Sequence, residues 1–202
     1  MEVSEYFSLL RNVKDVSIAT IDEDGNPQVR IIDIMIVKED CLFFLTARGK
    51  KFYKELLNNS SIAIVGLTSN WESIRMMGKV IKVEQDLLTT IFEDNPSMND
   101  VYPEESRNIL EVFCLKDGYG EYFDLSKHPI YRNYFKFGKG KINESGYLIN
   151  KKCISCGICK KKCPQNCIIE GQPYDIISEN CLHCGLCYEV CPVNAIERKE
   201  CY

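Results

Sequence analysis

The sequence predicts a mostly β first domain, a closed or split antiparallel β-barrel, followed by a small cysteine-rich α+β domain. Two observations predict this order. Five or six segments with strand patterns, separated by turn signals and accompanied by an early helix, fill the first two thirds of the chain. Cysteines then recur in two runs of identical spacing, 28 residues apart, in the last quarter. A β-sandwich is the alternative for the first domain.

Composition narrows the class of protein. The chain has 202 residues and a net charge of −4 with mixed charges, so neither nucleic acid nor a membrane surface is indicated as a partner. The acidic start lacks the apolar core of a signal peptide, and no apolar run approaches membrane-spanning length. Thiols outside the two runs point to a reducing cytosol, so we expect a cytoplasmic protein. These are Cys41, Cys114, Cys167 and Cys201.

The first elements follow from periodicity and turn chemistry. Residues 3–12 have the apolar spacing of a short amphipathic helix. Residues 15–21 alternate as a strand, and the Asp-Gly pair within residues 22–27 suits a hairpin turn. Residues 28–38 are apolar on both faces, which suits a strand in the wall of a small barrel. A third strand is expected at residues 41–46.

The remaining elements of the first domain are less regular. We expect helices at residues 50–58 and 84–93 and irregular structure at 94–107, where prolines interrupt the pattern. The other expected strands are 61–68, 71–83 with a bulge at Gly78, 109–115 and 121–125, the last two around a turn at Asp117-Gly118-Tyr119-Gly120. The expected domains are 1–137 and 147–202, joined by a Gly- and Lys-rich linker at 138–146.

The two cysteine runs read Cys-Ile-Ser-Cys-Gly-Ile-Cys-Lys-Lys-Lys-Cys-Pro from residue 153 and Cys-Leu-His-Cys-Gly-Leu-Cys-Tyr-Glu-Val-Cys-Pro from residue 181. This C-x2-C-x2-C-x3-C-P spacing resembles the two-cluster 4Fe–4S bacterial ferredoxins, in which the fourth cysteine of each run reaches the other cluster. The glycine inside each run lets the backbone turn close to sulfide. Structural zinc favours separated cysteine pairs, and disulfides belong to secreted chains, so neither alternative fits.

Two ligand sets follow from the ferredoxin spacing. Cluster one would be held by Cys153, Cys156, Cys159 and Cys191, and cluster two by Cys181, Cys184, Cys187 and Cys163.

Two stretches of the first domain carry a second resemblance. Asp-Gly-Asn-Pro-Gln-Val-Arg at 24–30 and Leu-Thr-Ala-Arg-Gly-Lys-Lys-Phe-Tyr-Lys-Glu-Leu at 45–56 resemble the flavin-binding split barrel of pyridoxamine-phosphate-oxidase-like proteins, over roughly residues 5–137. The resemblance implies a homodimer with FMN in a groove between subunits. Arg30 would contact the flavin or its phosphate, and the backbone of Ile31 and Ile32 would approach the ring. Thr46, Lys50 and Lys51 would hold the phosphate.

The lysine assignment also has a physical basis. Lys50 and Lys51 follow a glycine at an expected helix start, where free N–H groups already favour an anion. The alternative is that both lie on the solvated face of an amphipathic helix. Two departures from the oxidase pattern disfavour oxidation of pyridoxamine phosphate itself. Met35 stands where the oxidase has lysine, and residues 131–137 show no counterpart of its C-terminal tryptophan and arginine.

Several further residues have more than one interpretation. Cys167 stands where the second repeat has Ala195, and packing near a cluster explains it better than ligation. His183 either tunes cluster two by its charge or faces solvent. The lysines at 160–162 either dock an acidic partner or the barrel, or are simply solvated. For Trp71, Phe135 and Phe137 core packing is the default and the flavin groove the alternative; Arg75 is a further candidate for the groove.

Together these features predict an iron–sulfur flavoprotein oxidoreductase. Clusters carry single electrons, and FMN can collect them and reduce a small acceptor, which the sequence does not identify. An electron-donor or acceptor protein is the expected partner. The alternatives are an electron-transfer or redox-sensing module without its own small substrate, and a split barrel that holds haem or a deazaflavin. No residue stands out as a catalytic acid or base.

Overall fold

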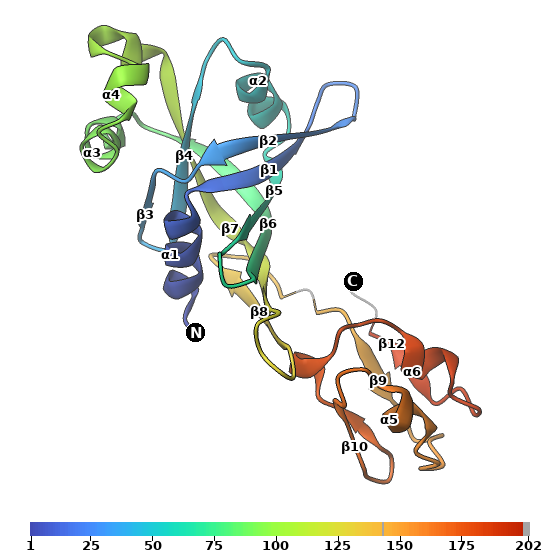
Figure 1. The fold of residues 1–202 in the computed structure, drawn as a ribbon. Helices are drawn as coiled ribbons and strands as arrows, with labels where there is room; N and C mark the ends of the chain where they lie inside the picture. The colour runs from blue at the N-terminus through green and yellow to red at the C-terminus, as the bar shows by residue number, and fades with distance from the viewer. Residues whose placement is uncertain (143, 200–202) are drawn as a thin grey trace.

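One curled antiparallel sheet of eight strands dominates the described part of the chain, residues 1–142 and 144–199 of this computed structural model (Figure 1). The order is β2-β1-β5-β6-β7-β4-β3, with β8 paired to β7. The split barrel predicted from the sequence is therefore confirmed, and the sandwich alternative is wrong. The strands are β1 (Asp15–Ile21), β2 (Pro27–Asp33), β3 (Ile36–Lys38), β4 (Cys41–Ala47), β5 (Ser61–Leu67), β6 (Glu72–Val83), β7 (Leu110–Asp124) and β8 (Tyr131–Phe137).

Helix α1 packs against β3, β5 and β8, helix α2 packs against β1 and β4, and α3 and α4 lie together near one end of the sheet (Figure 1). Helix α1 buries Tyr6, Phe7 and Leu10 in the main core. Helix α3 buries Leu88, Ile91 and Phe92 in a second core against β4 and β7. The helices of this part are α1 (Val3–Val13), α2 (Lys51–Asn58), α3 (Leu87–Asp94), α4 (Met98–Val101) and the 3₁₀ helix η1 (Glu104–Ile109).

Three expectations about secondary structure need correction. The strand expected at 28–38 is broken between β2 and β3, because Ile34 and Met35 leave the strand path and are buried. The segment 94–107 contains α4 and most of η1 rather than irregular structure. The two strands expected around Asp117–Gly120 are one continuous strand, β7, and β8 was not predicted at all.

The glycines of β7 explain the misread turn. Gly118 and Gly120 pair with Phe137 and Phe135 of β8, whose rings occupy the space that side chains on β7 would need. Gly78 likewise lies in a close approach of backbones, since a Cβ there would be 2.2 Å from the carbonyl oxygen of Asp117. The register shift itself lies between Lys79 and Val80, one residue beyond the predicted bulge.

The aromatic residues were only partly placed by the sequence. Phe135 and Phe137 are core residues as expected. Trp71 is not: it is 62% exposed and has a φ of 64°, in the turn before β6. The backbone of this turn, with its positive φ, directs the Trp71 side chain outward.

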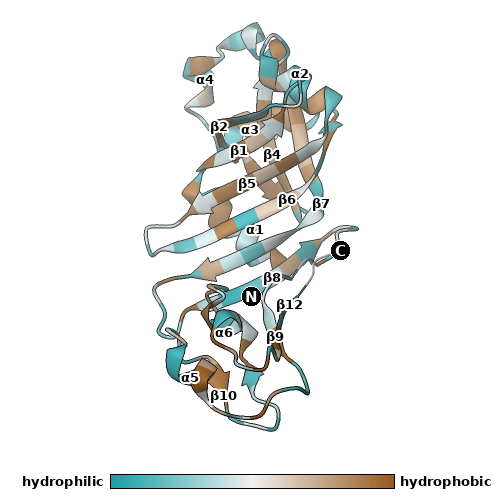
Figure 2. Ribbon diagram, turned by 90° about the vertical axis from the view of Figure 1, so that its right-hand side faces the viewer, coloured by the Kyte–Doolittle hydropathy of each residue, from teal (hydrophilic) through white to brown (hydrophobic). Residues whose placement is uncertain are grey.

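The cysteine-rich unit lies beside β8 at the far end of the sheet from β2 (Figures 1 and 2). It consists of two small antiparallel pairs, β9 with β12 and β10 with β11, and two short helices. None of the helices among the described residues has the length and apolar character needed to cross a membrane. The elements are β9 (Tyr147–Ile149), α5 (Ile158–Lys162), β10 (Ile168–Ile169), β11 (Asp175–Ile176), the 3₁₀ helix η2 (Ser178–Asn180), α6 (Leu186–Glu189) and β12 (Ile196–Arg198).

Two glycine substitutions should have opposite effects on stability, because Gly120 packs closely against β8 and Gly49 has no close neighbour. Gly120→Ala places a Cβ 2.3 Å from the buried Phe135 ring, which stacks on Tyr6, so we expect a loss of about 1–3 kcal/mol in unfolding free energy. Gly49→Ala meets no atom within 4 Å and restricts only the unfolded chain, so it should stabilise by about 0.4–1 kcal/mol. Urea denaturation measures both. Equal stabilisation by the two substitutions would contradict the close packing.

Candidate functional site

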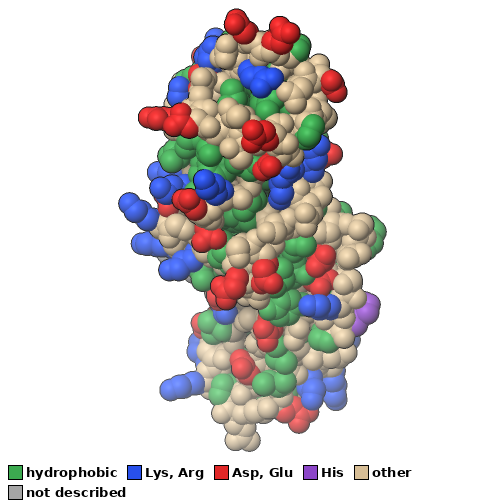
Figure 3. Space-filling view, turned by 90° about the vertical axis from the view of Figure 1, so that its left-hand side faces the viewer, with side chains coloured by type: hydrophobic (Ala, Val, Ile, Leu, Met, Phe, Trp, Pro, Cys, Tyr) green, Lys and Arg blue, Asp and Glu red, His purple; other side chains and the backbone are tan. Residues whose placement is uncertain are grey.

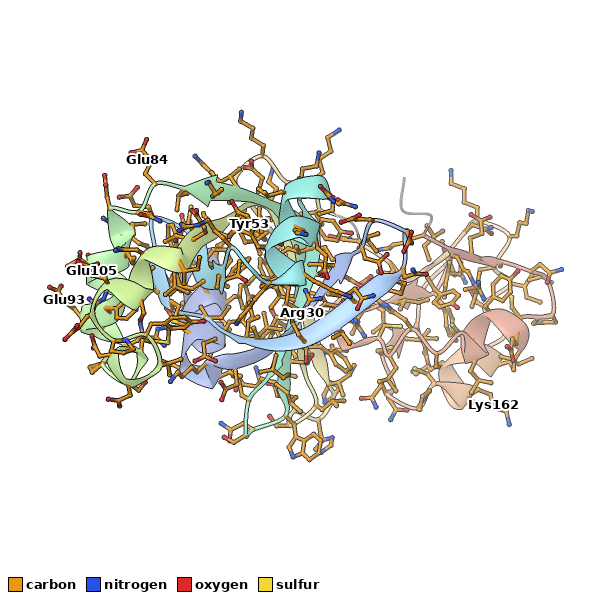
Figure 4. The ribbon with its side chains drawn as sticks, turned by 90° about the horizontal axis from the view of Figure 1, so that it is seen from above. Arg30, Tyr53, Glu84, Glu93, Glu105 and Lys162 are labelled. Carbon is orange, nitrogen blue, oxygen red and sulfur yellow. The ribbon has the colours of Figure 1, made fainter. Side chains whose placement is uncertain are left out.

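All six residues that the sequence suggested for a flavin line one groove of about 490 Å³ between β2, β4 and α2. The volume is within the usual range for small-molecule sites. Figure 4 looks into this part of the molecule, with Arg30 on β2 beneath helix α2. The six are Arg30, Ile31, Ile32, Thr46, Lys50 and Lys51.

One end of the groove suits an anion. Helix α2 begins at Lys51 without a side-chain cap or an acidic residue in its first turn, so its first N–H groups and dipole are uncompensated. Lys50 and Lys51 are both exposed there. The hydroxyl of Thr46 is buried and has no hydrogen-bond partner among the described residues. A phosphate would satisfy this hydroxyl and both lysines.

Arg30 is held by residues that sequence reasoning missed. Its guanidinium donates to the Thr20 hydroxyl at 2.9 Å and pairs with the buried Glu55 carboxylate at 2.7 Å. It also lies over the Phe52 ring, 4.5 Å from the centroid. Thr20 in turn donates to Glu55 at 2.5 Å. Arg30 is therefore fixed in place and its charge is balanced. The only sequence signal was that Phe52 and Glu55 lie three residues apart on the expected helix.

The opposite wall of the groove is apolar and comes partly from a segment expected to be irregular. Met98 and Val101 of α4 and the following Tyr102 face Leu110 and Met35 across it. A ligand that is anionic at one end and apolar at the other would match this polarity. Four other candidates do not line the groove. Trp71 is exposed, Arg75 pairs with Glu121 at 2.9 Å, and Phe135 and Phe137 lie in the core.

The eight motif cysteines line two separate pockets and are divided between them in the same way as the two predicted ligand sets. The first pocket is lined by Cys153, Cys156, Cys159 and Cys191, and the second by Cys163, Cys181, Cys184 and Cys187 together with Cys167, which is outside the motif. The fourth cysteine of each run therefore lies with the other run, as the ferredoxin spacing predicts.

The backbone conformation of the first cysteine run is repeated in the second run, as the sequence is. Gly157 and Gly185, which precede α5 and α6, have φ values of 74° and 82°. The neighbouring pairs Ser155 and His183, and Asn166 and Asn194, also have positive φ. Backbone N–H groups two residues along donate to the sulfurs of Cys153 and Cys181, each at 3.4 Å. Such donors stabilise thiolates, so the loops suit sulfur bound to a metal cluster.

Titration of the thiols differs between positions. Backbone hydrogen bonds, chiefly from Tyr174, lower the pKa of Cys153. A hydrogen bond with Cys167 lowers the pKa of Cys181 to about 6, whereas burial raises the pKa of Cys187 to about 11. Binding iron requires all of them as thiolates.

Two residues beside the second pocket were left open by the sequence. Cys167 is buried and lines this pocket, with its sulfur 3.5 Å from that of Cys163. Burial lowers the pKa of His183 to about 4, so this side chain is neutral at pH 7. It lies close under Gly146, and its Nε2 is buried, so neither a tuning charge nor full solvation describes it. Cys201 lies outside the described residues.

Comparison with known proteins agrees with both parts. A sequence profile described as pyridoxamine 5'-phosphate oxidase matches residues 4–108, more than half of the chain. The chain belongs to this family. A profile of the 4Fe–4S binding domain matches residues 174–197, which contain the second cysteine run, and this supports a 4Fe–4S cluster there. A search of curated proteins found no match to the chain.

Solved structures of family members share the barrel. A NimC/NimA family protein from Clostridium acetobutylicum has 20% identity and a TM-score of 0.59, over 67% of this chain and 92% of its own. A protein related to general stress protein 26, of the pyridoxinephosphate oxidase family and from the same organism, has 16% identity and a TM-score of 0.53, over 66% and 93%. A heme binding protein from Mycobacterium smegmatis has 11% identity and a TM-score of 0.52, over 67% and 58%. Such identities show the fold alone.

The two lysines of helix α2 should differ in their effect on ligand binding, because only Lys51 lines the groove. Lys51→Ala should raise the Kd for FMN about tenfold or more, because it removes a charged contact to the phosphate. Lys54→Ala removes the same charge from α2 at an exposed position outside the groove and should leave the Kd unchanged. Fluorescence titration of flavin-free protein measures both. Equal weakening would mean that the helix attracts phosphate only through its overall charge.

Proposed function

We propose that the protein is an iron–sulfur flavoprotein oxidoreductase that moves single electrons between two 4Fe–4S clusters and FMN and reduces a small acceptor. The observation that carries the proposal is a single chain with two cysteine-lined pockets, each containing four motif cysteines, and a groove with one end suited to a phosphate. The acceptor and the direction of flow are part of what the experiments must find.

Different groove residues would bind the phosphate and the ring of FMN. Lys50, Lys51 and the start of α2 would hold the phosphate, and Ile31 and Ile32 would lie against the ring. When bound, FMN supplies the ability to accept electrons singly and to deliver them in pairs. Tyr102 and the residues of α4 would keep water from the ring on the apolar side.

Proton delivery is assigned to water or to the acceptor. Two carboxylates line the groove, Glu55 and Asp33. Glu55 is fully engaged by Arg30 and Thr20, and Asp33 pairs with Lys14 at 3.8 Å. Burial and a hydrogen bond with Asp15 raise the pKa of Asp33, while the nearby Lys14 opposes its protonation. We therefore assign no dedicated protein acid to the groove.

FMN is favoured over haem by the lysines and the helix start at one end of the groove, which suit a phosphate. A haem takes His, Cys, Met or Tyr as its axial ligand. Neither of the two histidines, His128 and His183, is among the described residues that line the groove, whereas Met35, Met98 and Tyr102 do line it. A deazaflavin ligand would share the phosphate contacts, so only analysis of the bound pigment separates it from FMN.

The groove and the cysteine pockets lie toward opposite ends of the sheet. Going down the molecule in Figure 2, β2 is followed by β1, β5, β6 and β7, and β8 lies next to the cysteine-rich unit. Five steps between neighbouring strands amount to about 24 Å along the sheet. Because electron transfer falls off steeply with distance, transfer within one chain would be slow.

We therefore propose a homodimer that packs through the outer face of this sheet, away from α1. Ile31, which borders the groove, is 64% exposed there, and Val29, Val65 and Leu67 are 72%, 41% and 53% exposed. Ile31, Ser17 and Val65 are cross-strand neighbours, so the apolar side chains form one patch. A second copy would cover the patch and close the open side of the groove.

The proposal also places the protein in a reducing compartment. The eleven cysteines among the described residues are all free. Thiols and oxygen-sensitive clusters together suit the cytosol.

Cofactor content tests the main proposal. Protein purified without oxygen should contain about eight irons and eight sulfides and one FMN per chain. Cys184→Ala should lower the iron content by up to about half and slow flavin reduction by a one-electron donor, whereas Cys41→Ala, a thiol outside both pockets, should change neither. Zinc in place of iron, or a barrel that releases haem, deazaflavin or nothing, would refute it.

The dimer has a separate test. Val65→Glu puts a charge into the middle of the apolar patch and should convert the dimer to a monomer in sedimentation, with a weaker hold on FMN. Ile169→Glu, at a similarly exposed position on β10, serves as the matched control and should remain dimeric. A wild-type protein that sediments as a monomer at micromolar concentration would rule the dimer out.

A further inference from the structure

The two halves of the cysteine-rich unit share a fold but carry opposite charge. Residues 147–169 contain five lysines and no acidic residue. The corresponding stretch of the second repeat has Glu179 where the first has Lys151, and Glu189 where it has Lys161. Because both repeats form the same loops and helices, these lysines are not needed for folding. The difference must therefore lie in what each surface meets. The five are Lys151, Lys152, Lys160, Lys161 and Lys162.

The exposed lysines of the first repeat flank exposed apolar side chains in the sequence, beside the predicted ligands of cluster one. Lys151, Lys152, Lys161 and Lys162 are exposed and, in the part of the chain that the structure describes, none of them forms an ion pair. Between them in sequence, Ile154 is 63% and Ile158 39% exposed, next to the exposed Cys156. An apolar centre with a charged rim is the usual anatomy of a protein interface. We call these four lysines and two isoleucines the basic face.

The other cluster pocket is directed toward the barrel. The backbone N–H of Ile130, just before β8, donates to the Gln165 side chain at 3.2 Å, and its carbonyl oxygen accepts from Asn180 at 2.8 Å. Gln165 follows Cys163 closely, and Asn180 directly precedes Cys181, so both flank ligands of cluster two. The 3₁₀ helix η2 also contacts β8. Cluster two thus lies on the barrel side, and the basic face belongs to cluster one.

The chain also has an acidic segment, formed by α3, α4 and η1, but this segment does not neutralise the basic face. Acidic side chains gather over α3, α4 and η1 at the top of Figure 3. In Figure 4, Glu93 and Glu105 lie at one end of the molecule and Lys162 at the other. The basic face therefore remains available to another molecule.

We propose that the basic face docks an acidic one-electron carrier protein, and that cluster one is the first acceptor of its electrons. This deepens the proposed function and depends on cluster binding, but not on the identity of the pigment in the barrel. In each encounter the carrier is oxidised by one electron and cluster one is reduced by one, after which the electron moves to cluster two and the barrel. Opposite charges steer such encounters, which makes them sensitive to salt.

The test uses the cluster-loaded full chain and flavodoxin, an acidic one-electron carrier, as probe. The variant Lys151→Glu/Lys161→Glu installs the side chains that the second repeat already carries, so its fold should be preserved. The matched control, Lys38→Glu/Lys116→Glu, changes the net charge equally at exposed positions on the barrel. Calorimetry gives the Kd for oxidised flavodoxin, and stopped-flow bleaching of the iron–sulfur absorption gives the rate of reduction by reduced flavodoxin.

We expect the wild-type Kd to rise with ionic strength, and the variant to bind about tenfold or more weakly at low salt while the control is unchanged. Photoreduced deazariboflavin, a small neutral reductant, should reduce the clusters of all three proteins equally. Equal weakening in the control, a Kd indifferent to salt, tighter binding of a short DNA duplex, or salt-sensitive self-association through the acidic segment would overturn the docking proposal. Clusters that bleach normally beside a flavin that stays oxidised would instead refute the proposed function.

Discussion

The structure depends on the pairing of one long strand with different partners along its two halves. β7 pairs with β6 over nearly its whole length, with β4 along its first half and with β8 along its second. The first half therefore carries the barrel wall behind the groove, and the second half carries the strand against which the cysteine-rich unit packs. A change in this pairing would move both sites, because β8, in the part of the chain that the structure describes, pairs with β7 alone.

The sequence revealed this architecture only in part, and the failures have a common cause. Turn and periodicity signals located β1, the turn at 22–27, β4, α2 and β5 almost to the residue. Gly118 and Gly120 were read as a turn because glycine in sequence indicates either a bend or a close approach. Only the opposing rings of Phe135 and Phe137, which come fifteen and nineteen positions after their partner glycines, decide between the two. Such long-range information is absent from any local window.

The same limit applies to the sites. The cysteine spacing predicted two ligand sets, because each run has three cysteines within seven residues and the repeat supplies an internal check. The anion-binding end of the groove could also be predicted from a short stretch of sequence, since Thr46, Lys50 and Lys51 lie within six residues. The Glu55 and Thr20 partners of Arg30, and the apolar wall from α4, depend on contacts between distant segments. They could not be read from the sequence.

Rigidity of the sheet is the physical reason for the proposed dimer. Side chains can move to admit a ligand, but a hydrogen-bonded sheet cannot shorten the path from β2 to β8. A loop or linker motion is also restricted, since Lys139 donates its backbone N–H to Asp117 at 2.7 Å and Gly140 packs on Gly118. If electrons from the clusters reach the groove, then a groove of one subunit served by the clusters of another is the arrangement that best fits a sheet of this length. The outer face of β2 and β5, with its unusually exposed Val29 and Ile31, is where that association would bring a foreign surface to the edge of the groove.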